Sequence, residues 1–198
     1  IEGLENIPKD GKFLIVSNHP MGAADAIALY YKIYPVRNDL FFFANELFVY
    51  LLGAFHELLA PVVWNKEKET HSANKVTLER LSVFFGDDRP GIIFPSGRLS
   101  KLTFFGLWDR PWEKTPIALA KKYNFPLIPV YVEGRNSCFF YFASYVNKQL
   151  RDVSQLNELF NKRDKIISIK IGKPVSVSSL SDNSDICLLY TSDAADEI

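Results

Sequence analysis

Residues 13–25 read FLIVSNHPMGAAD, and this stretch decides the fold class. Its first five residues form a short apolar run that is typical of a buried strand. Pro20 cannot donate a main-chain hydrogen bond and so ends the strand ladder. Residues 23–33 then indicate a helix, with Asp25 in the first turn, where a carboxylate suits the helix dipole. A buried strand that leads into a helix is the unit of an α/β fold.

The same alternation of strand and helix continues along the chain. We expect further strands at residues 40–43, 61–64, 91–94, 127–132 and 166–171, and further helices at residues 46–55, 72–85, 116–123, 139–150 and 153–161. This order predicts a single α/β domain over residues 1–180, with a mixed, largely parallel sheet flanked by helices. In open sheets of this kind, functional sites gather beyond the carboxyl ends of the strands.

The composition excludes some classes of protein. With 47% hydrophobic and 14% aromatic residues among 198, the chain is not of the disordered class. Lys plus Arg and Asp plus Glu number 23 each, so no basic excess supports a nucleic-acid partner. Two cysteines form no disulfide framework, and we expect Cys138 to be a buried structural thiol. No metal-ligand spacing or glycine-rich nucleotide loop is present, so we expect neither a metal nor a cofactor.

Both ends of the chain carry signs of truncation. The sequence begins at Ile1 without a methionine. Residues 187–197, CLLYTSDAADE, resemble a translated adapter sequence from DNA library preparation. We therefore expect a domain that is truncated at both ends, followed by a non-native tail over residues 187–198.

The longest apolar stretch, Leu40 to Val63, is interrupted by polar residues such as Asn45 and Glu57. A membrane-spanning helix needs about 20 mostly apolar residues, so we expect no such helix here. Two interpretations stay open for this stretch. It forms a buried helix, or it lies as an amphipathic segment in a lipid interface.

The first polar cluster follows the first predicted strand and runs from Asn18 to Asp25. A loop of five residues, with Gly22 for flexibility, can fold Asp25 back toward the His19 ring. A carboxylate on one ring nitrogen fixes the tautomer and leaves the other nitrogen to accept a proton from a substrate hydroxyl. The alternative is a purely structural pair. His56 and His71 have no comparable setting, and we expect ordinary roles for them.

The second cluster follows the strand at residues 91–94 and reads FPSGRLSK from Phe94 to Lys101. Main-chain N–H groups in a Pro/Gly turn, together with Arg98 and Lys101, suit a phosphate. Ser96 is not the nucleophile of a G-x-S-x-G elbow, because Phe94 occupies the place of the first glycine. A plain surface turn is the alternative.

The third cluster is EGRNS, residues 133–137, directly after the strand at 127–132. Arg135 could contact the acyl donor or an acidic head group. It could equally form a structural salt bridge to Glu133 or another carboxylate.

These clusters, in this order, resemble the motifs of the phospholipid/glycerol acyltransferase family. The matching stretches are Asn18 to Asp25, Pro61 to Lys66, Phe94 to Ser100 and Pro126 to Val132. The closer resemblance is to the branch often labelled hemolysin-like, which shares the longer His-to-Asp spacing, an Asp-x-x-Trp motif (here Asp109 to Trp112) and a Glu-Gly-Arg-Asn-Ser run. The resemblance spans nearly all of residues 1–175.

The resemblance implies a glycerol-3-phosphate acyltransferase-like fold, with His19 as the general base and Asp25 as its partner. It implies that the loops bind substrate through Asn18, Gly22, Pro95, Ser96, Gly97, Arg98, Ser100, Lys101 and Arg135. The chain departs from the commoner family pattern, because Ser96 replaces a frequent glutamate and Leu99 stands where an arginine is usual. A lyso-aminolipid acceptor is therefore expected beside a lysophosphatidic acid-like one.

The implied reaction moves a fatty acyl group from a thioester of acyl carrier protein or coenzyme A to the hydroxyl of a lysolipid. The expected location is peripheral, on the cytoplasmic face of the inner membrane, with Leu40 to Phe55 forming an acyl tunnel or an interfacial face. Two rival classes stay open. One is a lipid ester or thioester hydrolase that uses the same His-Asp pair, and the other is a non-enzymatic lipid-binding protein of the hemolysin-like kind.

Overall fold

The structure is a computed structural model that describes residues 1–45, 49–50, 53–62, 71–104, 106–163 and 165–179. The expected non-native tail at residues 187–198 lies outside these ranges. The main sheet consists of β1 (Leu14–Ser17), β2 (Phe41–Asn45), β3 (Leu59–Val62), β4 (Gly91–Ile93), β7 (Leu127–Glu133) and β8 (Ser168–Ile171). The helices are α1 (Ala23–Ile33), α3 (His71–Gly86), α4 (Thr115–Tyr123), α5 (Cys138–Val146) and α6 (Lys148–Phe160), with short 3-10 turns at η1 (Leu4–Asn6), η2 (Gly53–Leu58) and η4 (Val177–Ser179).

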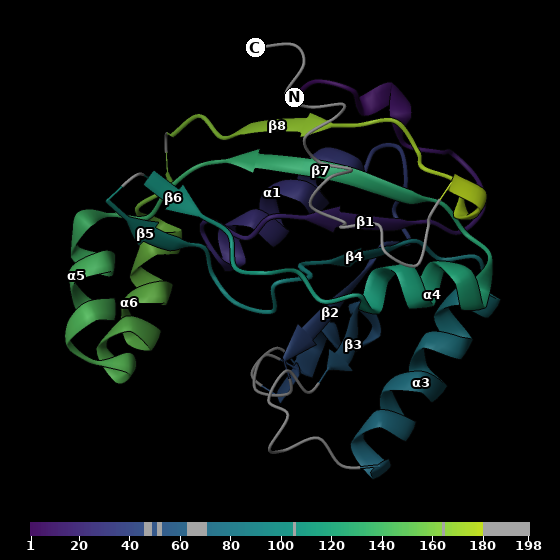
Figure 1. Ribbon diagram of the computed structural model, residues 1–198, viewed down its shortest axis with the longest axis horizontal. Helices are drawn as coiled ribbons and strands as arrows, with labels where there is room; N and C mark the ends of the chain where they lie inside the picture. Colours follow the sequence, from purple (N-terminus) through teal and green to yellow (C-terminus); the bar gives the residue numbers. More distant parts are fainter. Residues whose placement is uncertain (46–48, 51–52, 63–70, 105, 164, 180–198) are drawn as a thin grey trace.

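The sheet has the strand order β3-β2-β4-β1-β7-β8, which places β1 between β4 and β7. The first five strands in this order are parallel to their neighbours, and only β8 runs antiparallel, along β7. This confirms the predicted mixed, largely parallel sheet. The carboxyl ends of β1 and β7 point to the left in Figure 1, toward α5 and α6.

Helices cover both faces of the sheet (Figure 1). Successive strand residues point to opposite faces, so Leu14 and Val16 pack with α3 and α4, whereas Phe13 and Ile15 pack with α1. All four of these side chains are buried. Strands that are apolar on both faces are typical of a parallel sheet with helices on each side.

The carboxyl edge of the sheet carries a small antiparallel hairpin, β5 (Lys101–Thr103) and β6 (Gly106–Trp108), which the sequence reasoning did not predict. Its strands have three residues each, too few to show an alternating pattern. Helix α5 ends at Val146 and helix α6 begins at Lys148, so the break between them comes earlier than the one predicted between residues 150 and 153. Asn147 is extended, and its side chain accepts a hydrogen bond from the N–H of Gln149, so the amide ends α5 and caps α6.

The described residues of the stretch Leu40 to Val63 do not form one continuous buried helix, which was one of its two interpretations. Phe41 and Phe43 lie in β2 and are buried in the core, because β2 is an internal strand between β3 and β4. These two rings therefore cannot serve an interfacial face. Residues 46–48 and 51–52 of the predicted helix lie outside the described ranges, and residues 53–58 form a 3-10 turn. Within the described residues, every helix is too short or too polar to span a membrane.

Candidate active site

Three loops that follow three adjacent strands meet around His19. Residues 18–22 follow β1, residues 94–100 follow β4, and residues 133–137 follow β7. The N–H of Ser100 donates to the carbonyl oxygen of His19 at 2.9 Å, which joins the first two loops. Gly134 packs against Met21, which joins the first loop to the third. The three clusters predicted from the sequence therefore share one site at the carboxyl edge of the sheet.

His19 and Asp25 lie side by side in this site. The Nδ1 atom of His19 is 3.0 Å from Oδ2 of Asp25. The two atoms are close but are not aligned as a hydrogen bond. The Asp25 side chain is fully buried, whereas 19% of the His19 side chain is exposed. Because Nδ1 faces the acid, Nε2 is the nitrogen left to take up a proton.

The turn between β1 and α1 brings the acid back to the ring. Gly22 has φ +82°, a conformation that side chains disfavour, and this allows the chain to reverse just before α1. The main-chain N–H groups of Met21 and Gly22 both donate to Oδ2 of Asp25 at 2.9 Å. These bonds hold the carboxylate in one position. The other oxygen, Oδ1, has no hydrogen-bond partner among the described residues.

Phe94 supports the imidazole from one side. Its ring stacks on the His19 ring, with 4.0 Å between ring centroids and 23° between ring planes. Phe94 directly follows β4 and is buried. The stacking fixes the plane of the imidazole, as Asp25 fixes its rotation. The sequence motif includes Phe94 but does not predict its contact with His19.

Asn18 is engaged with the neighbouring strand. Its side-chain Nδ2 donates to the carbonyl oxygen of Val132 at 2.9 Å, and its Oδ1 accepts from the N–H of Val132 at 2.8 Å. The amide group thus continues the pairing of β1 with β7 by one residue. In the structure, the Asn18 amide fixes the start of the loop that carries His19. Its expected contact with substrate stays a prediction.

The predicted head-group loop is a compact turn. Gly97 has φ +59°, and its N–H donates to the carbonyl oxygen of Phe94 at 2.9 Å. The Ser96 hydroxyl donates to the carbonyl oxygen of Arg98 at 2.8 Å. Pro95 is buried, and its carbonyl oxygen accepts from Glu113.

The cations of this loop point to solvent. The Arg98 and Lys101 side chains are exposed, whereas Ser100 is buried. The predicted contact with an acidic head group is therefore open to these two cations, and both serine hydroxyls bond within the protein.

Asp109 is a site residue that sequence reasoning quoted only as part of the resemblance. Its Oδ1 accepts from the Ser100 hydroxyl at 2.8 Å, and its Oδ2 accepts from the Trp112 indole N–H at 2.5 Å. Ser100 in turn bonds to the main chain of His19. Burial raises the pKa of the Asp109 carboxyl, while the bonds from Trp112 and Ser100 oppose that shift. Asp109 therefore fixes the 94–101 loop under His19.

The third loop packs closely against the first. A Cβ atom added to Gly134 would lie 2.4 Å from the Met21 sulfur, so only glycine fits there without a shift. Asn136 is buried, and its two side-chain polar atoms have no hydrogen-bond partner among the described residues. Its main-chain N–H donates to the Tyr141 hydroxyl at 3.1 Å. Burial raises the pKa of the Tyr141 phenol, and the neighbouring Arg135 opposes that shift.

Arg135 itself is exposed, between β7 and α5. Two residues on, Ser137 caps α5 and is held by Glu158 of α6, whose carboxylate also pairs with buried Lys162 at 3.0 Å. Cys138, the first residue of α5, is exposed. The expectation of a buried thiol is thus wrong, because the helix start points this side chain away from the core.

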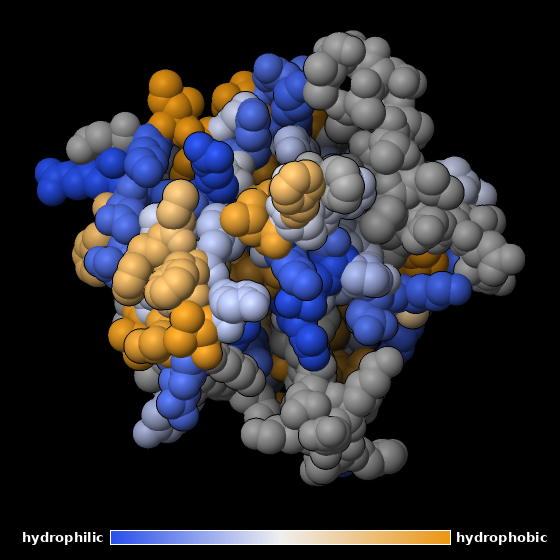
Figure 2. Space-filling view, turned by 60° about the vertical axis from the view of Figure 1, so that its left-hand side comes forward, coloured by the Kyte–Doolittle hydropathy of each residue, from blue (hydrophilic) through white to orange (hydrophobic). Residues whose placement is uncertain are grey.

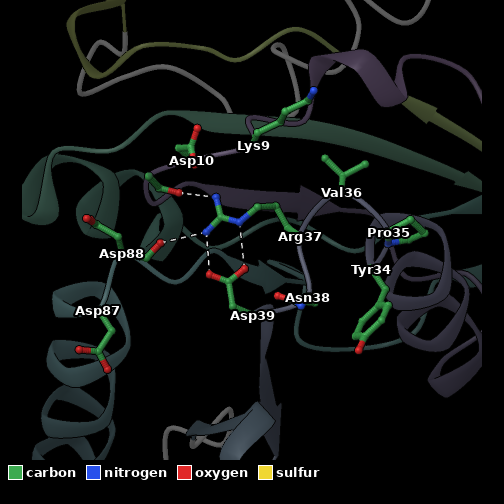
Figure 3. A pocket seen from close by; sticks show the side chains of 11 residues that line it. Lys9, Asp10, Tyr34, Pro35, Val36, Arg37, Asn38, Asp39, Asp87 and Asp88 are labelled. Carbon is green, nitrogen blue, oxygen red and sulfur yellow. Dashed lines mark hydrogen bonds and ion pairs between the residues drawn. The ribbon is translucent and has the colours of Figure 1, made fainter.

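An open, shallow pocket lies elsewhere, at the amino ends of the strands (Figure 3). Its volume is about 380 Å³, and Arg37 lies at its centre. The guanidinium donates to both oxygens of Asp39, at 2.9 and 2.8 Å, and to the carbonyl oxygens of Gly11 and Asp88. The Arg37 guanidinium thus joins Asp39 to the main chain at Gly11 and Asp88, and we interpret its role as structural. The described residues hold no cluster of His, Cys, Asp or Glu suited to a metal ion.

Comparisons with known proteins found similar sequences. A family model described as "Acyltransferase" matches residues 1–187. The chain is 32% identical over 182 residues to a lyso-glycine lipid O-acyltransferase of Phocaeicola vulgatus, and 32% identical to one of Bacteroides thetaiotaomicron. Each alignment covers 88% of this chain, and 63% and 65% of the two relatives. The chain thus spans a little less than two thirds of the length of these relatives.

Proposed function

Because the chain belongs to this acyltransferase family, we propose that it transfers a fatty acyl group from an acyl thioester to the hydroxyl of a lysolipid. His19 is the general base, and Asp25 orients it. The observation that carries the proposal is the 3.0 Å contact of Nδ1 with the buried Asp25 carboxylate, on a ring that is itself partly exposed. A purely structural pair would have no need of a ring that reaches the surface.

The proposed reaction is a direct transfer. Nε2 of His19 takes the proton of the acceptor hydroxyl while its oxygen attacks the thioester carbonyl carbon. The tetrahedral intermediate then collapses, the carbon–sulfur bond breaks, and the imidazolium returns the proton to the departing thiolate. Asp25 stabilises the imidazolium during these steps. No acyl-enzyme forms, so no nucleophilic side chain is required.

The proposed acceptor carries an acidic head group. Arg98, Lys101 and Arg135 are exposed on the second and third loops of the site. Guanidinium and ammonium groups bind carboxylates and phosphates through charge-assisted hydrogen bonds. The relatives' names point to a lyso-glycine lipid, and a lyso-aminolipid of this kind is our first choice over a lysophosphatidic acid-like acceptor.

The proposal includes an acyl carrier protein or coenzyme A thioester as donor. It also includes a peripheral location on the cytoplasmic face of the inner membrane, where a lysolipid acceptor would be met. General-base assistance by His19 accounts for about 10²- to 10⁴-fold of the rate.

The test is an acyl-transfer assay with the products measured by mass spectrometry. The protein is incubated with palmitoyl-coenzyme A or palmitoyl-acyl carrier protein, and with lyso-glycine lipid or lysophosphatidic acid. We expect a diacylated product, and we expect His19→Ala to reduce its formation by at least about 100-fold. His56→Ala is the matched control, because His56 is an exposed histidine on η2, outside the three loops.

Two results would contradict the proposal. Free fatty acid in place of diacylated product would indicate the rival hydrolase. Unchanged transfer by the His19→Ala variant would remove His19 as the base.

A further inference from the structure

Aromatic side chains are exposed beside the site, on α5 and on the β5–β6 hairpin. We call Phe104, Trp108, Phe139, Phe142 and Tyr145 the aromatic face. These side chains are between 62% and 99% exposed. Figure 1 shows α5 and the hairpin at the same edge of the molecule, and Figure 2, with this side turned forward, shows a group of hydrophobic residues on the surface.

Helix α5 is apolar on all its sides. Phe140 and Ala143 are buried, and Phe139, Phe142 and Tyr145 are exposed. A helix at a protein–water boundary normally has a polar outer face, whereas one that is apolar all round is covered by protein or by lipid. An exposed group of large apolar side chains marks an interaction surface.

The exposed charges next to the aromatic face are mostly cations, with Glu133 beside Arg135 as the exception. Residues 101–108 and 138–146 contain a single charged residue, Lys101. The exposed cations Arg98 and Arg135 lie on the neighbouring loops. Aromatic residues together with Lys and Arg suit the head-group region of a bilayer, where anionic lipids attract cations.

We propose that the aromatic face inserts into the head-group region of an anionic lipid bilayer. The inference rests on the proposed function in one respect, since it supplies a route for the lysolipid. The aromatic face borders the loops around His19, so an acceptor could pass from the bilayer to the base without crossing water. Transfer of exposed aromatic rings into the interface lowers the free energy of the system. The cations bind the lipid phosphates.

Trp108 provides an intrinsic probe for this insertion. The chain is mixed with vesicles of phosphatidylcholine and phosphatidylglycerol whose acyl chains carry bromine, which quenches nearby tryptophan fluorescence. We expect quenching with the wild-type chain and its loss in Trp108→Phe, which keeps Trp112 and Trp64 as references. We also expect quenching to weaken when phosphatidylglycerol is omitted or salt is raised.

A second measurement compares two triple variants in vesicle flotation. Phe139→Ser, Phe142→Ser and Tyr145→Ser together should weaken vesicle binding by at least about tenfold. The matched control changes three exposed apolar residues on α1 and α3, namely Ile27→Ser, Tyr31→Ser and Val83→Ser. The control should bind within about twofold of the wild type, because these residues lie on other elements.

The outcomes separate this inference from the proposed function. Wild-type protein that shows no quenching, or that forms dimers through this face in place of binding vesicles, overturns the inference. Equal binding by the aromatic triple variant does so too. If that variant fails to fold, the Trp108 quenching decides alone. Vesicle binding without any acyl transfer to a monomeric short-chain lysolipid overturns the proposed function and leaves the docking face standing.

Discussion

Buried charged side chains at the two ends of the parallel strands differ in how completely they are hydrogen-bonded. At the amino end, the buried guanidinium of Arg37 bonds to two oxygens of Asp39 and to two main-chain carbonyl oxygens. At the carboxyl end, Asp25 is equally buried, yet one of its oxygens has no partner among the described residues. A buried polar atom left unpaired costs about 1–3 kcal/mol. The amino end is thus built for stability, whereas the carboxyl end gives up stability at the pair that we propose to be catalytic.

The largest expected effect comes from Asp25→Asn. Asparagine keeps an oxygen that can accept from Met21 and Gly22, so the turn should persist. It cannot stabilise an imidazolium, and its N–H₂ group can force the His19 ring into the wrong tautomer. We expect acyl transfer to fall by roughly 10³- to 10⁴-fold, with a free energy of unfolding close to that of the wild type. Steady-state kinetics and urea unfolding measure the two quantities.

The outcome that would contradict the comparison is an Asp25→Asn variant that unfolds readily and yet keeps its turnover per folded molecule. The carboxyl end would then be the structural one. The result would also remove the physical basis for treating His19 and Asp25 as a catalytic pair.

The converse effect is expected at the amino end, from Arg37→Ala. The change removes four hydrogen bonds and a cation–π contact with Phe13, and it leaves Asp39 without its partner. We expect the free energy of unfolding to fall by about 2–3 kcal/mol, because Asp39 is partly exposed and water softens the loss. Turnover per folded molecule should stay unchanged. Urea unfolding and an active-site-normalised assay at low temperature test this, and a matching loss of turnover would show that the two ends are coupled.

The smallest expected effect concerns pH, and its sign differs between the two ends. The hydrogen bonds from Arg37 lower the pKa of Asp39, so the stability that Asp39 contributes is present above its usual pKa of 3.8 and is lost as the pH falls through the folded value. Burial raises the pKa of Asp109, so its contribution is complete below 3.8 and is lost as the pH rises through the folded value.

Urea unfolding of Asp39→Asn and Asp109→Asn between pH 3 and 7 would compare the two signs. The stability advantage of the wild type over Asp39→Asn should grow with pH, and its advantage over Asp109→Asn should shrink. Each change should stay within about 1 kcal/mol, because solvent screens a partly exposed pair. Asparagine at position 109 can still accept from Trp112 and donate to Ser100, so packing is preserved. If the two stability differences changed with pH in the same direction, the opposite pKa shifts of Asp39 and Asp109 would be contradicted.

The sequence predicted the fold well where the apolar pattern is strong. The run FLIVS and its turn located β1, α1 and the His19–Asp25 pair, because a buried parallel strand is apolar on both faces. The β5–β6 hairpin escaped prediction, since its short strands are mostly exposed and carry no burial pattern. The contacts of Phe94 and Asp109 with the His19 region also escaped, because stacking and side-chain bonds between distant residues leave no periodic signal in the sequence.

The roles of the predicted substrate-binding residues depend on details that only coordinates supply. Ser96 and Ser100 share a loop with Arg98, and the sequence cannot tell which of them face inward. The structure directs both hydroxyls to protein groups and leaves the cation exposed. The exposure of Phe139 and Phe142 likewise has no signal in the sequence, because both share a helix with buried Phe140.

The pair of hydrogen bonds between Asn18 and Val132 has a consequence for protein synthesis. It joins residues 114 positions apart, at the base of the loop that carries His19. A nascent chain that has not yet released β7 from the ribosome lacks this support for its general base. We therefore expect the chain that precedes β7, residues 1–126, to be inert toward acyl thioesters while it is being translated, and reactivity to arise only after β7 has paired with β1.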